Sequence, residues 1–144
     1  MNITIKNNIN YFTKKPKTLF LVDGLGSALT TFNLYFVLTH FYEYFGMPTY
    51  ILTYLSLIGL VFCIFSMTYF FLLKGNWTPF LKLISIGNLI YCVLTMVLLY
   101  IYFNDLTKLG LIYFLIEITI IVVIVYIELW VATALKNNKK NSIA

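Results

Sequence analysis

Three acidic side chains lie inside long apolar stretches of this 144-residue sequence, away from the stretch ends: Asp23 in the first stretch, and Glu117 and Glu128 in the last. Insertion scales assign about 2.5–3.5 kcal/mol to an aspartate at the centre of a membrane helix, so such an acid needs a partner or a proton. Hydroxyl groups would join helices at a lower cost. The three acids therefore predict a site that binds protons or a small cation.

Two asparagines lie at depths that match those of the acids. Asn33 is in the first apolar stretch and Asn88 in the third. At a rise of about 1.5 Å per residue, Asp23, Asn88 and Glu128 come to lie about 9–12 Å from the inner ends of their helices. Asn33 and Glu117 fall together nearer the outer end. We therefore predict two groups of polar side chains, in which the asparagines are hydrogen-bonding partners of the acids.

Three further ionisable residues are possible mouth residues. His40 and Glu43 lie three positions apart at the outer end of the first stretch, a spacing that puts two side chains on one helix face. Lys82 lies just below the inner group, where it could pair with the acids; alternatively, the two inner acids share a proton. No lysine is predicted near Glu117, so we expect its neutral, protonated form.

Catalytic and metal-binding patterns are not visible. The sequence has one histidine and scattered acids, which gives no metal-ligand spacing. It also lacks a recognisable nucleophile–base arrangement or phosphate-binding loop, so we expect no cofactor and favour a protein that is not an enzyme. A lipid-handling enzyme that uses the inner acids is a third alternative.

The same polar groups also have a purely structural interpretation. Hydroxyls and amides hold membrane helices together at around 0.6 kcal/mol per hydrogen bond. The main hypothesis is a polytopic protein that binds or translocates a small cationic or proton-linked solute through its buried carboxylates. The alternative is a non-catalytic accessory or assembly subunit of a larger membrane complex.

Four apolar stretches must position these residues, in a sequence whose hydrophobic share is 61%. They run over residues 19–44, 48–73, 79–103 and 108–135, and each exceeds the roughly 20 residues that cross a hydrocarbon core. The intervening loops are short, which favours antiparallel neighbours. Residues 1–17 and 136–144 are basic tails. The sequence thus predicts an all-α membrane protein with one four-helix domain over residues 18–135.

Each stretch carries one stripe of polar, small or seam-forming residues at intervals of three and four, the spacing of helices packed in a left-handed bundle. The four predicted stripes are Asp23, Gly26, Thr30, Asn33, Val37 and His40; Ser56, Gly59, Cys63 and Ser66; Ser85, Asn88, Cys92 and Thr95; and Gly110, Phe114, Glu117, Ile121, Ile124, Glu128 and Leu135. We predict an up-down-up-down bundle with these stripes inside and large apolar side chains towards lipid.

The lysines indicate orientation. Nine of the ten basic residues flank one side of the predicted bundle, and Lys108 alone lies on the other. This bias predicts cytoplasmic N and C termini in an inner membrane. A nucleic-acid partner is disfavoured because no aromatic-rich basic groove is present. The expected partners are the bilayer, protons or a small cationic solute, and a second copy or a larger membrane complex.

The two cysteines, Cys63 and Cys92, fall near mid-membrane without a CxxC spacing. We expect them to be small apolar fillers with free thiols. A redox pair between the second and third helices is the alternative.

Four segments carry a resemblance to known sequences: LFLVDGLG at residues 19–26, FGMP at 45–48, NLIYC at 88–92 and LGLIYFLIE at 109–117. Together they resemble a group of uncharacterised small bacterial four-helix membrane proteins, over nearly all of the chain beyond the first tail. The resemblance implies a four-span fold and residence in the inner membrane. It implies no activity.

Overall fold

The computed structural model describes residues 12–141, and within that range the chain is helical without strands. Residues 1–11 and 142–144, which belong to the predicted basic tails, lie outside the described residues. The elements are α2 (Lys17–Phe32), the π-helix η1 (Asn33–Leu38), α3 (Tyr42–Phe45), α4 (Thr49–Leu72), α5 (Thr78–Ile101) and α6 (Lys108–Asn141).

Four spans are long and apolar enough to cross a membrane: Lys17–Leu38, Thr49–Leu72, Thr78–Ile101 and Lys108–Asn137. The predicted all-α bundle with four membrane helices is therefore confirmed. The first span is not one continuous α-helix, because η1 and a turn separate α2 from α3. The last helix runs to Asn141, beyond the end that hydropathy predicts, so part of the basic tail is helical.

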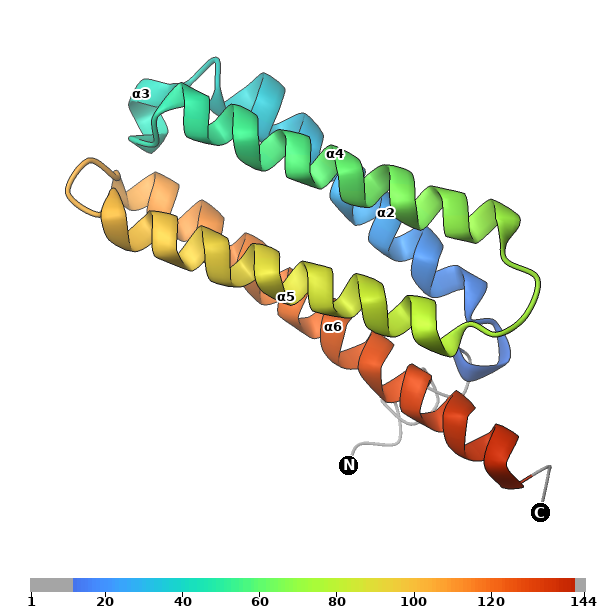
Figure 1. Cartoon of the computed structure of the whole chain (residues 1–144). Coiled ribbons are helices and arrows are strands. Elements are labelled where there is room, and N and C mark those ends of the chain that lie inside the picture. The colour runs from blue at the N-terminus through green and yellow to red at the C-terminus, as the bar shows by residue number, and fades with distance from the viewer. Residues whose placement is uncertain (1–11, 142–144) are drawn as a thin grey trace.

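The helices run alternately up and down and form two hairpins (Figure 1). In one hairpin α2 packs along α4, and in the other α5 packs along α6, whereas contacts between the hairpins are sparser. We call the end where α2 begins and residues 73–77 join α4 to α5 the basal end. The opposite end, which holds α3 and residues 102–107, is the distal end.

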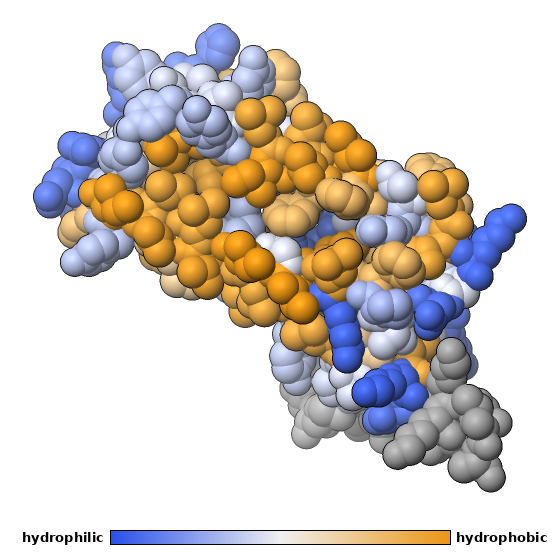
Figure 2. All heavy atoms as spheres, in the orientation of Figure 1, coloured by the Kyte–Doolittle hydropathy of each residue, from blue (hydrophilic) through white to orange (hydrophobic). Residues whose placement is uncertain are grey.

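The outside of the bundle is apolar along its middle. Figure 2 shows an orange band across the face formed by α4 and α5, with hydrophilic residues gathered at the two ends. Leucine, isoleucine, valine and phenylalanine side chains supply most of the exposed large residues, including Leu57, Ile64, Ile90 and Val123. Such a surface suits hydrocarbon and is unlike that of a water-soluble monomer.

Small residues allow the first hairpin to close tightly. A Cβ added at Gly59 would lie 2.8 Å from the Thr31 hydroxyl and 3.7 Å from the Ser27 carbonyl oxygen on α2. The Thr31 hydroxyl donates to the Ser27 carbonyl at 2.8 Å and approaches the Ser56 carbonyl at 3.3 Å. Close backbone approach through small residues drives helix packing in lipid, where the hydrophobic effect between helices is absent.

Most of the predicted stripes face inward. On α4, α5 and α6 the stripe residues are buried or half-buried; the fully polar members among them are Ser56, Ser66, Ser85, Asn88, Thr95, Glu117 and Glu128. On α2 the stripe faces inward from Asp23 to Asn33. The helical period therefore identifies the inner faces of four helices.

The first stripe fails beyond Asn33. The predicted members Val37 and His40 are exposed, whereas Leu38 is buried. Leu34, four residues after Thr30, is still on the inner face. In η1 the Thr39 N–H donates to the Leu34 carbonyl, five residues back, at 3.2 Å, and the Thr39 hydroxyl donates to the same oxygen at 2.8 Å. The wider turn holds one extra residue, so every later side chain is rotated by about 100° from its α-helical place.

Backbone contacts join the two hairpins at the distal end, in what we call the distal clasp (Tyr44, Phe45, Gly46, Thr107 and Gly110). The Thr107 N–H donates to the Phe45 carbonyl at 3.2 Å, and its hydroxyl donates to the Tyr44 carbonyl at 2.5 Å. The Gly110 N–H donates to that hydroxyl at 3.1 Å. Gly46 has φ +77°, the left-handed conformation that ends α3.

We predict that Gly110→Ala destabilises the bundle. A Cβ there would overlap the Phe45 carbonyl oxygen and lie 3.0 Å from its carbon, so the hairpins would have to separate. We expect the free energy of unfolding to fall by about 1–3 kcal/mol. Thermal unfolding in detergent micelles, followed by circular dichroism, measures this.

Gly26→Ala is the matched control, because a Cβ at Gly26 meets no atom within 4 Å. This substitution in a helix interior should be neutral or stabilising by about 0.5–1 kcal/mol. If both variants lowered the free energy of unfolding equally, the close contact of Gly110 with Phe45 would not explain the loss.

Candidate functional site

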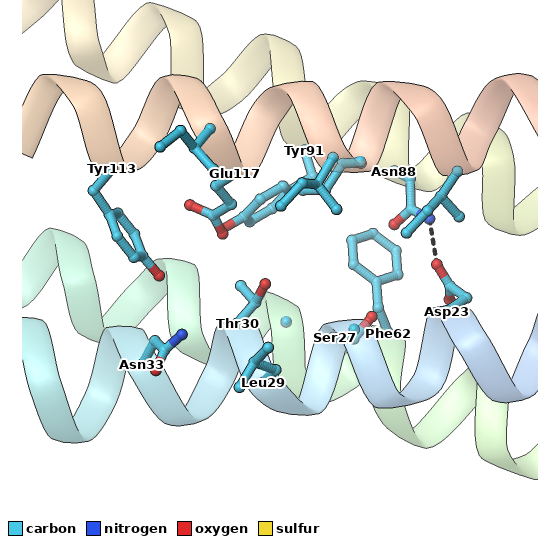
Figure 3. A pocket seen from close by; sticks show the side chains of 16 residues that line it. Asp23, Ser27, Leu29, Thr30, Asn33, Phe62, Asn88, Tyr91, Tyr113 and Glu117 are labelled. Carbon is cyan, nitrogen blue, oxygen red and sulfur yellow. Dashed lines mark hydrogen bonds between the residues drawn. The ribbon is translucent and has the colours of Figure 1, made fainter.

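Asp23 is buried on α2 and bound from two other helices. The Asn88 amide on α5 donates to its Oδ1 at 2.6 Å, and the Ser66 hydroxyl on α4 donates to its Oδ2. Both carboxyl oxygens thus have a partner. The dashed line in Figure 3 marks the bond from Asn88. The depth estimated from the sequence correctly brings Asp23 and Asn88 together.

Glu128 is fully buried on α6, beside Ser85 of α5. The Ser85 hydroxyl lies 2.8 Å from Glu128 Oε2 and also 2.8 Å from the Leu81 carbonyl oxygen. A hydroxyl has one hydrogen and can donate to only one of them. If it donates to the Leu81 carbonyl, the bond to Glu128 requires a protonated carboxyl group there, whose O–H donates to the Ser85 oxygen. The other oxygen of Glu128, Oε1, has no hydrogen-bonding partner among residues 12–141.

A cavity of about 260 Å³ lies between α2 and α6, with α4 and α5 behind it (Figure 3). Its wall is mainly apolar. Four of the five predicted site residues line it: Asp23, Asn33, Asn88 and Glu117. The bundle therefore gathers most of the predicted polar groups around one space.

Glu117 points into this cavity from α6. Its Oε1 accepts a hydrogen bond from the Tyr91 hydroxyl of α5 at 3.1 Å. Its Oε2 is buried and makes no hydrogen bond of full geometry within the described part of the chain, although Thr30 of α2 lies beside the carboxyl group and the side chain is only 7% exposed. A buried polar atom without a partner is costly and is uncommon in native structures. Oε2 is itself enclosed, so a molecule in the cavity reaches it once the Glu117 carboxyl group rotates towards the cavity.

The distal part of the cavity has further polar groups. Figure 3 shows Thr30 on α2 facing Glu117, and Asn33 lying opposite Tyr113 of α6. Tyr113 and Glu117 lie one turn apart on the same helix face. The helices on both sides of the cavity thus contribute hydrogen-bond donors and acceptors to its lining.

Four predicted residues lie elsewhere: Glu128, His40, Glu43 and Lys82 do not line the cavity. His40 is exposed in the turn after η1 and Glu43 is exposed on α3, so the turn between them removes the shared helix face that spacing predicts. Lys82 is half-buried, and within residues 12–141 the structure records no ion pair between it and a buried acid.

Sequence reasoning missed the aromatic members of the site. Tyr91, Tyr113 and Phe62 all line the cavity, although tyrosines in this sequence suggest interfacial belts and packing. A signal for Tyr91 is its place three residues after Asn88, on the edge of the same stripe. Tyr113 stands four residues before Glu117. Spacing of this kind identifies the helix face but not the void beside it.

Both cysteines have free thiols; Cys92 is buried and Cys63 half-buried. Among the residues whose placement is described, no three His, Cys, Asp or Glu side chains gather as a metal site would require. The polar chemistry of the cavity consists of carboxyl, amide, hydroxyl and phenol groups.

The fold and site define a multi-pass helical membrane protein with a mainly apolar cavity, lined in part by carboxyl, amide and hydroxyl groups, inside a four-helix bundle. No protein-family model, no characterised protein and no solved structure matches the chain. The function must therefore be argued from the site.

We predict that Asp23→Ala destabilises the bundle more than Asp23→Asn. Alanine leaves the Asn88 amide and the Ser66 hydroxyl buried without a partner, which costs about 1–3 kcal/mol. Asparagine keeps an acceptor for Asn88 and a polar group for Ser66. Unfolding in mixed micelles by increasing sodium dodecyl sulfate measures the difference.

Thr119→Ala serves as the control for this series. Thr119 is exposed and its hydroxyl bonds only to the Leu115 carbonyl of its own helix, so the change should stay within about 0.5 kcal/mol. If Asp23→Ala were as mild as Thr119→Ala, the network at Asp23 would not hold the helices together.

Proposed function

We propose that this chain binds a small cationic solute, such as an amine, in the cavity between α2 and α6, and that Glu117 anchors it. The observation that carries the proposal is the unpartnered Oε2 of Glu117, buried at the wall of a cavity. Amide and hydroxyl groups of Asn33, Asn88 and Thr30 surround the same space. An ammonium group offers a hydrogen-bond donor for Oε2 and a positive charge to pair with the carboxylate.

The size of the cavity supports a small ligand. Its volume of about 260 Å³ exceeds an engineered cavity of about 150 Å³ that takes benzene. It lies just below the range of about 300–1,000 Å³ for drug-sized ligands. One ring or a short chain with a single polar group therefore matches the space.

Charge balance links binding to protons. A carboxyl group in hydrocarbon is stable either as the neutral, protonated acid or as a carboxylate that is paired with a cation. Net transfer of an ammonium ion from water to protonated Glu117 releases one proton to water, because the amine can leave that proton there, enter uncharged and take up the carboxyl proton. An ammonium–carboxylate ion pair then replaces the neutral acid. Proton and solute thus compete for one site, which is the basis of proton-linked uptake.

Benzylamine is a suitable probe, and we predict that Glu117→Gln weakens its binding at least tenfold, or by about 1.4 kcal/mol. Glutamine keeps the shape and an acceptor but cannot form the ion pair. Isothermal titration of the purified protein in detergent measures the dissociation constant. In proteoliposomes, the same variant should lose pH-dependent benzylamine uptake.

Two controls accompany this test. Asp105→Asn removes an exposed carboxylate that is not part of the cavity lining and should leave the affinity unchanged. Gly26→Leu places a side chain into the cavity where a Cβ meets no neighbour, so the fold should persist while binding is lost. Absence of benzylamine binding to the folded wild-type chain would overturn the proposal and favour the accessory-subunit alternative.

The placement of the lysines supports cytoplasmic termini in an inner membrane. Lys17, Lys74 and Lys136 lie at the basal end, whereas Lys108 lies at the distal end. Positive charge is retained on the cytoplasmic side. We propose that the basal end is cytoplasmic.

Cysteine labelling tests this orientation in a chain whose native Cys63 and Cys92 are replaced by alanine. Asn104→Cys at the distal loop should react with a membrane-impermeant maleimide in intact cells. Asn137→Cys near the end of α6 should react only after lysis. Both positions are exposed, so the reverse pattern would place the basal end outside.

A further inference from the structure

We infer that the cavity is filled from the lipid, through a lateral mouth between α2 and α6, and that its ligand is an amphiphilic amine whose apolar tail remains in the bilayer. This inference rests on the proposed function and names the substrate class. It follows from which sides of the cavity are closed and which side is open.

Both ends of the cavity are closed by packed side chains. On the distal side Leu34, Leu38 and Phe114 belong to a buried cluster, and each is at most 1% exposed. On the basal side the bonds of Asp23 to Ser66 and Asn88 cross the bundle. Below them, a second buried cluster fills the basal end. A solute in water at either end therefore meets a plugged bundle.

The side between α4 and α5 is closed by Phe62. Figure 2 shows a hollow between these helices, but the Phe62 ring extends from α4 over Gly87 of α5. A Cβ added at Gly87 would lie 2.7 Å from this ring, which shows how closely the two surfaces meet. Phe62 also packs edge-on against Tyr91, with ring centroids 6.5 Å apart. Phe62 thus forms the back wall of the cavity.

The side between α2 and α6 is different, because cavity-lining residues there are also on the outer surface. Leu29 on α2 is 62% exposed, and Ile116 and Ile120 on α6 are each 55% exposed. These two helices make few contacts with each other. The three side chains therefore frame an opening rather than a seal.

This opening lies at mid-membrane depth. Leu29 and Ile120 each come 12 residues after the start of their helices, which is about 18 Å along the axis. The hydrocarbon core is about 30 Å thick, so the mouth meets acyl chains and not water. A molecule that enters there must already be dissolved in lipid.

Because the cavity is open on one side, its volume does not limit the length of the ligand. A closed cavity of about 260 Å³ would exclude a ligand with a long tail. An open lateral side lets the head reach Glu117 while the tail stays among lipid chains beside Leu29 and Ile120. A small polar head on an apolar chain is the ligand that suits both the buried acid and the apolar rim.

A pair of probes tests the inference in lipid nanodiscs: benzylamine and 4-hexylbenzylamine, with dissociation constants expressed against the probe concentration in the membrane. We expect the hexyl probe to bind wild-type protein within about threefold of benzylamine or more tightly. Leu29→Trp, which narrows the mouth, should weaken the hexyl probe at least tenfold more than benzylamine. Leu83→Trp, at an exposed α5 position outside the cavity lining, should change neither affinity.

The outcomes separate this inference from the proposed function. If benzylamine binds and the hexyl probe is excluded from wild-type protein, the cavity site stands and the lateral mouth is wrong. If Leu29→Trp weakens both probes equally, the mouth is likewise not where the tail leaves. If neither probe binds, the proposed function fails and this inference fails with it.

Discussion

Asp23 joins three of the four long helices, because its two carboxyl oxygens bind Asn88 on α5 and Ser66 on α4. In hydrocarbon no water is present to bind a polar group, so a polar group without a partner in the protein is costly. A carboxyl group on α2 therefore obliges two other helices to present donors at the same depth. The backbone contacts of the distal clasp join the hairpins again at the other end. Between these two fixed points the hairpins separate enough to leave a cavity.

The buried acids are distinguished by their partners rather than by their burial. Asp23 has a donor for each oxygen and holds helices together, which is the structural role that hydrogen-bonded polar groups have in membranes. Glu117 lines the cavity, with a donor to Oε1 and an enclosed Oε2 that has no hydrogen-bonding partner within the described part of the chain. Glu128 also has an unpaired oxygen, but it lies away from the cavity lining. The same residue type thus has different uses at different positions in one bundle.

Much of this arrangement can be predicted from the sequence, since bilayer thickness and the helical period are strong constraints. The four spans, the inward faces of α4, α5 and α6, and the meeting of Asp23 with Asn88 all follow from them. Val37 and His40 could not be placed correctly, because a π-helical turn depends on tertiary packing and leaves no clear sequence signal. The cavity could not be predicted either. A void between α2 and α6 depends on how far two hairpins approach, which periodicity does not encode.

The π-helical segment has a consequence for comparing this chain with others. A turn bonded over five residues contains one residue more than an ordinary helical turn, so η1 amounts to a single-residue insertion accommodated without a loop. A homologous bundle with a regular first helix would be one residue shorter between Asn33 and the turn at His40. An alignment that leaves out this gap would match the exposed Val37 to an inward-facing position, and the two chains would look less related than their folds are.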